Sequence, residues 1–129
     1  MLRTILAVVF GWAVVVALVV ATDMVIMKVF PNEYVEGRTP PDSLALLSLG
    51  TSILWSVFGA WLCAFIARTR IWSHAIYLMV WGEIIGAVST VMAWGKIQSW
   101  YQIGLLVAWP IAVIVGAWIR ARQVPAQLR

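Results

Sequence analysis

The stretch TILAVVFGWAVVVALVVAT, residues 4–22, contains no charged residue and decides the fold. At about 1.5 Å per residue, an α-helix of this length nearly covers the ~30 Å hydrocarbon core of a membrane. A helix also satisfies its own backbone hydrogen bonds, as a chain in lipid must. Residues 43–67 and 97–119 are uncharged as well, and residues 71–95 carry only one charged residue, Glu83. The sequence therefore predicts four membrane-spanning helices.

The composition supports the same interpretation. Of the 129 residues, 64% are hydrophobic and 11% are charged, and a water-soluble domain of this size could not bury so much apolar surface. We expect an all-α integral membrane bundle in a single domain, residues 1–129, with helices at about 4–30, 43–67, 72–94 and 97–120 and an outer loop at 31–42. The positive start and Val19–Val20–Ala21 resemble a signal peptide, but the apolar stretch is long for one, so a retained helix is expected.

The basic residues predict the orientation, because Lys and Arg are enriched in cytoplasmic segments. The N-terminus, the second connection and the tail contain Arg3, Arg68, Arg70, Arg120, Arg122 and Arg129, whereas the other two connections contain Lys28, Arg38 and Lys96. Both termini are therefore expected in the cytoplasm, with the chain in the bacterial inner (cytoplasmic) membrane. The net charge of +4 follows from this asymmetry, so nucleic acid is not an expected partner.

Small residues recur every four positions in the second helix, at Ser48, Ser52, Ser56, Ala60 and Ala64. Gly59, Cys63 and Ala67 lie beside them, and the later helices add Gly82, Gly86, Ala108, Ala112 and Gly116. Such faces let helix backbones approach closely in lipid. They predict either a tight bundle or a surface that docks a partner's helix, and the pattern does not choose between the two.

Three further residues concern helix ends and shape. Asp42 or Ser43 is expected to cap the second helix, because both side chains can accept a hydrogen bond from a free backbone N–H. Pro110 lies near the centre of the fourth helix and predicts a kink there.

Glu83 is the only carboxylate in the middle of a predicted span. A charged carboxylate there would cost several kcal/mol, so the neutral acid is favoured. Its expected neighbours by depth and helix face are Ser52, Ser56 and Thr90, with Trp12 or Trp109 as further donors. Two roles follow: a helix-packing hydrogen bond between neutral groups, or a proton or cation site, which intramembrane carboxyl groups often mark.

The chain has nine tryptophans, and four of them, Trp12, Trp55, Trp81 and Trp109, fall near mid-depth. These rings could contact a partner subunit or line a surface for a lipid, quinone or pigment, although no cofactor is required by the sequence. With one His and one Cys, the chain has no metal-ligand or catalytic pattern. An enzyme is therefore not expected, and no metal site is predicted.

Four motifs run along the chain: MLR at residues 1–3, VFPNEY at 29–34, GAWLCAFIAR at 59–68 and GAWIRAR at 116–122. With them, the whole chain resembles a diffuse group of small bacterial four-helix inner-membrane proteins. This resemblance implies the membrane fold and no particular activity.

The leading hypothesis is a non-catalytic accessory subunit of a larger membrane complex for energy transduction or transport. Three observations support it: the small-residue faces, the deep tryptophans and the near absence of extramembrane sequence. The expected partners are membrane lipids and other membrane subunits. The alternative is a small homo-oligomeric transporter or channel, coupled to protons or cations through Glu83.

Overall fold

The computed structural model describes residues 2–128, which form four α-helices and two short 3-10 turns. The helices are α1 (Leu2–Val29), α2 (Asp42–Ala67), α3 (Ile71–Met92) and α4 (Ser99–Arg122), and the turns are η1 (Pro31–Glu33) and η2 (Ala126–Leu128). Each of the four helices is long and apolar enough to cross a membrane. The prediction of an all-helical fold with four such helices is confirmed, and each helix begins and ends within two residues of its predicted range.

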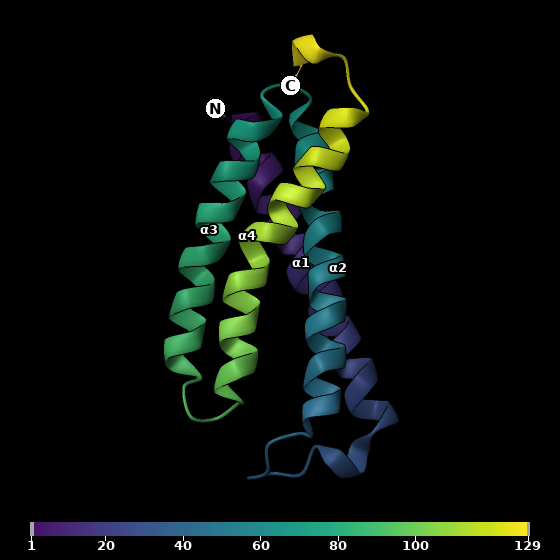
Figure 1. Ribbon diagram of the computed structural model, residues 1–129, viewed down its shortest axis with the longest axis vertical. Helices are drawn as coiled ribbons and strands as arrows, with labels where there is room; N and C mark the ends of the chain where they lie inside the picture. Colours follow the sequence, from purple (N-terminus) through teal and green to yellow (C-terminus); the bar gives the residue numbers. More distant parts are fainter. Residues whose placement is uncertain (1, 129) are drawn as a thin grey trace.

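Consecutive helices run in opposite directions, so the bundle has two distinct ends (Figure 1). The end that carries both termini and the α2–α3 turn holds Arg3, Arg68, Arg70, Arg120 and Arg122, and we call it the arginine end. The opposite end carries residues 30–41 and the α3–α4 turn, residues 93–98, and we call it the loop end. Helix α2 packs against all three other helices.

The small residues of α2 are a packing face inside this chain. Ser48, Ser52, Ser56, Ala60 and Ala64 are all buried, as are Gly59, Cys63 and Ala67. A Cβ on Gly11 of α1 would lie 2.8 Å from the Cβ of Cys63 and 3.0 Å from the carbonyl oxygen of Gly59. On the other side of α2, a Cβ on Gly116 of α4 would lie 2.7 Å from the Cβ of Ala60. The glycines therefore set the distance between α2 and both neighbours.

The main cluster of buried apolar residues lies in the half of the bundle nearest the arginine end, and a few others, Ile26, Leu44 and Ala45, are buried near the loop end. Its members are Ala7, Val8, Ala60, Cys63, Ala64, Ala67, Ile71, Ala75, Leu78, Val113, Ala117 and Ala121. Leu78 of α3 and Val113 of α4 are both 0% exposed. Small residues dominate this set, so helix backbones come close and leave little space between them.

The start of α2 corrects one prediction. Neither Asp42 nor Ser43 caps the helix, because Pro41 occupies the N-cap position and no side chain caps the free N–H groups. Asp42 is instead the first helical residue, and its carboxylate accepts a hydrogen bond from Trp100 Nε1 at 3.3 Å. The side chain thus joins α2 to the first turn of α4 at the loop end.

Two other local features shape the bundle. The α2–α3 turn places Arg68 and Arg70 at φ 63° and 50°, a left-handed conformation that is costly for any residue with a Cβ. Pro110 lies inside α4, and the helix changes direction near its middle, as the proline predicts (Figure 1).

Candidate functional site

A cavity of about 330 Å³ lies between the four helices, in the half nearer the loop end. One wall is the valine ridge of α1, formed by Val15, Val16, Val19 and Val20, and the wall on α4 includes Leu105, Leu106 and Trp109. Polar side chains come from α2, α3 and α4. The volume is in the range of small-molecule sites, about 300–1,000 Å³, and the mixture of apolar walls with a few polar groups is also typical of them.

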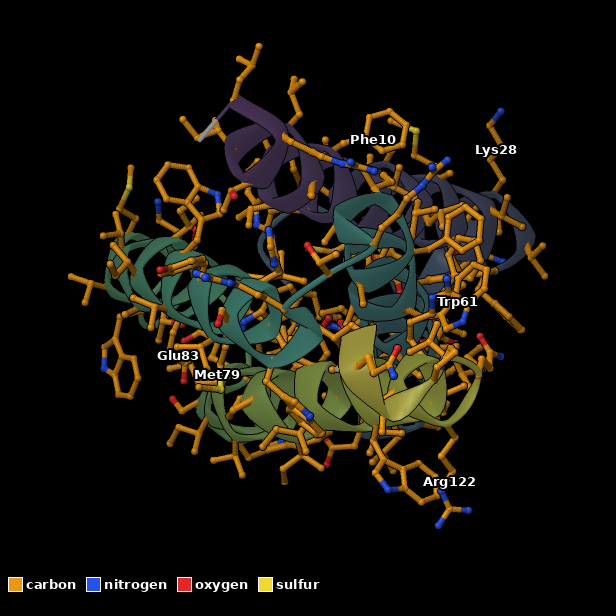
Figure 2. The ribbon with its side chains drawn as sticks, turned by 90° about the horizontal axis from the view of Figure 1, so that it is seen from above. Phe10, Lys28, Trp61, Met79, Glu83 and Arg122 are labelled. Carbon is orange, nitrogen blue, oxygen red and sulfur yellow. The ribbon has the colours of Figure 1, made fainter. Side chains whose placement is uncertain are left out.

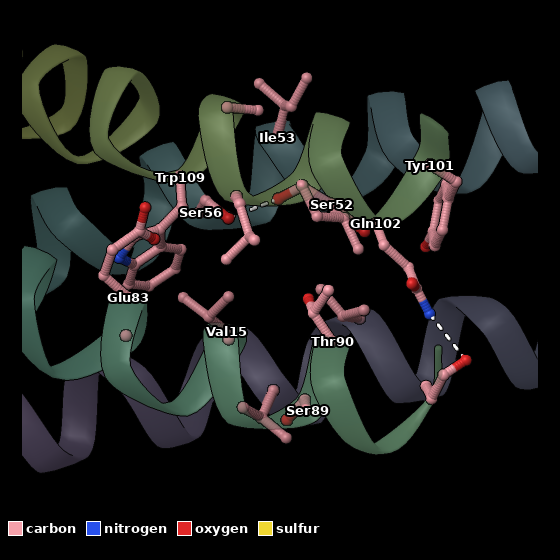
Figure 3. Close-up of a pocket in the computed structure, with 18 of the residues that line it drawn as sticks. Val15, Ser52, Ile53, Ser56, Glu83, Ser89, Thr90, Tyr101, Gln102 and Trp109 are labelled. Atoms are coloured by element: carbon pink, nitrogen blue, oxygen red, sulfur yellow. Dashed lines mark hydrogen bonds between the residues drawn. The ribbon is translucent and has the colours of Figure 1, made fainter. Parts of the chain in front are cut away.

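Six of the eight residues singled out from the sequence line this cavity: Trp12, Ser52, Ser56, Glu83, Thr90 and Trp109. Figure 3 shows Glu83 and Trp109 at one end, Tyr101 and Gln102 at the other, and Ser52 and Thr90 between them. The four helices therefore bring together groups that are far apart in the sequence.

The other two tryptophans lie outside the cavity. Trp55 Nε1 donates to Thr22 Oγ1 at 2.9 Å and ties α2 to α1. Trp81 is exposed on α3 and packs edge-to-face on Trp12, with ring centroids 6.4 Å apart. Both indoles therefore join helices of this chain.

The predicted depth of Trp109 in the membrane suggested that its indole would donate to Glu83, but it does not. Its Nε1 donates to the carbonyl oxygen of Met79 at 3.0 Å. The ring fits against α3 because residue 82 is glycine, and a Cβ there would overlap the indole. Trp109 therefore fixes the distance between α3 and α4 at the level of Glu83.

Three buried acceptors in the cavity have no hydrogen-bond partner within the described part of the chain. They are Glu83 Oε2, Ser52 Oγ and Gln102 Oε1. Ser52 and Gln102 are only 5% and 4% exposed. A buried polar atom without a partner costs about 1–3 kcal/mol, so native proteins rarely leave several together. Three in one cavity indicate a site that completes its hydrogen bonds with something other than this chain.

Glu83 also lines a second hollow on the outer side of α3 and α4. This groove is formed with Met79, Val80, Ile84, Ala87 and Pro110. Figure 2 shows Glu83 and Met79 close together where α3 lies beside α4. The carboxyl group therefore lies between the cavity among the four helices and the apolar outer surface. Within residues 2–128, no Lys, Arg or His lines either hollow.

A polar cluster at the loop end of the cavity was not predicted from the sequence. Ser48 Oγ donates to Asp23 Oδ1 at 2.7 Å and lies 2.9 Å from Tyr101 OH. Tyr101 and Gln102 line the cavity, and Gln102 Nε2 donates to the carbonyl oxygen of Ala93 at 3.1 Å. An amide within an otherwise apolar span was the signal for Gln102. The contact between Asp23 and Ser48 has no such signal, because it depends on how α1 and α2 are rotated.

Across residues 2–128, no group of three or more His, Cys, Asp or Glu side chains could hold a metal ion. Comparison with known proteins gives no family model, no curated protein and no solved structure that matches this chain.

Proposed function

We propose that this chain is a small ion-coupled membrane transporter whose cavity holds an amphipathic cation at Glu83. The observation that carries the proposal is the set of three unpartnered acceptors, Glu83 Oε2, Ser52 Oγ and Gln102 Oε1, in a cavity with apolar walls. The Glu83 carboxylate and Gln102 Oε1 only accept hydrogen bonds, and the Ser52 hydroxyl can also accept one, so the three favour a ligand that donates. Apolar and aromatic walls favour a hydrophobic body, and the absence of basic side chains among the described lining residues favours a positive charge.

Glu83 can couple cargo to protons because a carboxyl group has two states. The carboxylate pairs with an ammonium group in the cavity, whereas the protonated acid offers no charge to hold it. Binding of the cation therefore releases a proton, and protonation of Glu83 releases the cation. The position of Glu83 between the cavity and the groove at Pro110 also gives the cargo a short route to the lipid.

The accessory-subunit hypothesis remains the alternative, with other membrane subunits as partners. It was based on small-residue faces and deep tryptophans that could contact a neighbouring subunit. The face of α2 contacts α1 and α4 of this chain, and Trp55 and Trp109 donate hydrogen bonds within it. The transporter proposal instead uses the cavity oxygens that have no hydrogen-bond partner among the described residues, and we therefore prefer it. The alternative predicts that the protein extracted gently from its own membranes migrates with other chains.

We further propose that the chain spans the bacterial inner membrane with its arginine end in the cytoplasm. The support is the concentration of arginines at that end. A fluorescent protein fused to the C-terminus should then fluoresce, and alkaline phosphatase at the same position should be inactive. The reverse pattern would exclude this orientation.

The test of function compares three probes of equal chain length, octylammonium, octyltrimethylammonium and octanol. Trp12 and Trp109 line the cavity, so quenching of tryptophan fluorescence reports binding. Octylammonium, which has both charge and N–H donors, should bind best. Glu83→Gln should weaken octylammonium binding about 10-fold or more, since a hydrogen bond to a charged group contributes about 1.5–3 kcal/mol.

The matched control is Glu36→Gln, which changes an exposed glutamate of the loop at the loop end. It should bind octylammonium as the unchanged protein does. Equal binding of octanol and octylammonium, or no effect of Glu83→Gln, would overturn the proposal. Uptake of octylammonium into proteoliposomes with a proton gradient then separates transport from binding alone.

A further inference from the structure

The hydroxyl and amide groups of the cavity lie mostly between Glu83 and the loop end, and the apolar core cluster lies on the other side of Glu83. From the level of Glu83 to the arginine end, the interior is mainly this core, including Leu78, Val113 and Ala60, together with the buried His74, whose Nε2 lies 3.2 Å from Thr4 Oγ1. From Glu83 to the loop end, it contains the cavity and the hydroxyl and amide groups described above. A proton or a water molecule therefore meets very different surroundings on the two sides of Glu83.

A continuous hydrogen-bonded chain begins at the loop end. Asp23 is half-buried on α1, about two turns before the helix ends. Its carboxylate accepts the hydrogen of Ser48, 2.7 Å away on α2, so Tyr101 of α4 must donate to Ser48 across the 2.9 Å contact. The phenol oxygen then has free lone pairs at the cavity. The chain thus joins three helices and reaches from the loop end into the cavity.

Further acceptors continue from Tyr101 towards Glu83. Ser48, Ser52 and Ser56 are buried and lie one above another on α2, so they span about 12 Å at 1.5 Å per residue. Ser52 Oγ and Gln102 Oε1 have no partner among the described residues and stand beside the cavity. A cavity of about 330 Å³ with such groups is large and polar enough to admit water. Water can therefore connect Tyr101 to Glu83.

We infer that Glu83 exchanges its proton with the side at the loop end, and that Asp23, Ser48 and Tyr101 form the entry. This inference rests on the proposed function. As the donors point, a proton leaving Glu83 passes along water in the cavity to the oxygen of Tyr101. Tyr101 passes its own hydrogen to Ser48, and Ser48 passes its own to Asp23. With the donors reversed, the same chain carries a proton inward. Each relay oxygen ends with the number of hydrogens it began with, so the net change is one proton lost by Glu83 and one gained by Asp23.

Two other titratable groups bear on this route, His74 and Tyr34. The His74 imidazole is buried towards the arginine end, 2.9 Å from the carbonyl oxygen of Arg70 and 3.2 Å from Thr4 Oγ1, so it lies on the far side of Glu83 from the entry. Burial raises the pKa of Tyr34 in the outer loop above its usual value, and the charge of the nearby Asp23 carboxylate raises it further. Tyr34 therefore remains a neutral phenol beside the entry. Tyr101 is the only titratable group besides Glu83 among the described residues that line the cavity.

The first test determines the side from which Glu83 is reached. Dicyclohexylcarbodiimide modifies protonated carboxyl groups in apolar surroundings, and mass spectrometry measures the fraction of Glu83 modified. Right-side-out and inside-out membrane vesicles are prepared with the internal pH clamped and the external pH varied. In both preparations, the modified fraction of Glu83 should depend on the pH on the side of the membrane that the loop end faces. Modification that follows the pH at the arginine end would overturn the inference.

The second test concerns the entry residues. Asp23→Asn should lower proton-driven uptake of octylammonium about 10-fold or more while leaving its binding unchanged by tryptophan quenching. Ser48→Ala gives a second variant with the same expectation. The matched control, Asp42→Asn, removes an acid at the same end that contacts Trp100 and not Ser48, and it should behave as the unchanged protein does.

The two proposals fail in different ways. Suppose that Asp23→Asn and Ser48→Ala both take up octylammonium normally, while Glu83→Gln no longer binds it. That result would exclude the proposed entry and leave the transporter proposal intact. Normal octylammonium binding by Glu83→Gln would exclude the transporter itself, and the entry with it.

Discussion

Ser48 and Ser52 lie one helical turn apart on α2 and are both buried, but Ser52 lines the cavity and their hydrogen bonds differ. The hydroxyl of Ser48 contacts Asp23 and Tyr101, whereas Ser52 Oγ has no partner among the described residues. Ser48→Ala should therefore destabilise the protein by about 1 kcal/mol. Ser52→Ala should be neutral or stabilising, because it removes an unsatisfied buried group. Unfolding in mixed micelles of increasing dodecyl sulfate content measures both, and equal losses would contradict this assignment.

The residues of the site were partly predictable. Glu83 stands out in the sequence because it is the only acid in an uncharged run. Its helix face placed Thr90 near it, and depth placed Ser52, Ser56, Trp12 and Trp109 near it. Depth does not reveal which way a side chain points. The four deep tryptophans were therefore treated alike, although Trp55 bonds to Thr22 and Trp81 packs on Trp12, and the link from Asp23 to Ser48 was missed.

At the scale of the helices, the glycines make unequal contributions that a pair of substitutions can separate. Gly116→Ala should destabilise the bundle by about 1–3 kcal/mol, since the added methyl meets α2 at Ala60 and at the backbone of Trp61. Gly50→Ala is the matched control, because nothing lies within 4 Å of a Cβ there. It should be neutral or stabilise α2 by about 0.5–1 kcal/mol. The same micelle titration measures both, and similar effects would show that α2 and α4 are not closely packed.

The α2–α3 turn gives a prediction of the opposite sign. Arg70 has φ 50°, and glycine adopts this conformation without steric cost. Arg70→Gly should therefore stabilise the protein by about 1 kcal/mol, provided that orientation is preserved by the remaining arginines. Arg122→Gly, in the last turn of α4, is the control and should not stabilise. A decrease in stability for Arg70→Gly would mean that the guanidinium group has a role that outweighs the strain.

The helices themselves could be predicted closely, because uncharged runs and turn residues mark their ends. Their rotation could not. All four helices are apolar around most of their circumference, so no face stands out as it does in a water-soluble helix. The small-residue stripe of α2 was the exception, since a row of Ser and Ala is recognisable without any contrast in hydrophobicity. Which helix met that stripe still depended on the folded structure.

At the scale of the whole molecule, the bundle has a packed half and a hollow half. The cavity lies in the hollow half, and the packed half separates Glu83 from the arginine end. The proposed transport cycle would expose the site to each side in turn, and in that cycle the packed half has to open. Substitutions that tighten it further should slow turnover more than they weaken binding. Val113→Ile, at a position that is 0% exposed, is expected to show this in uptake measured beside tryptophan quenching.

Cys63 lies in that packed half, 1% exposed and against Gly11, and it is the only cysteine of the chain. The natural protein is thus already a single-cysteine reporter, placed at a contact that the proposed transport cycle would separate. A maleimide too bulky for the closed bundle should label it slowly at rest and faster during turnover. The proposed cycle can therefore be timed on the unmodified sequence, with no cysteine introduced.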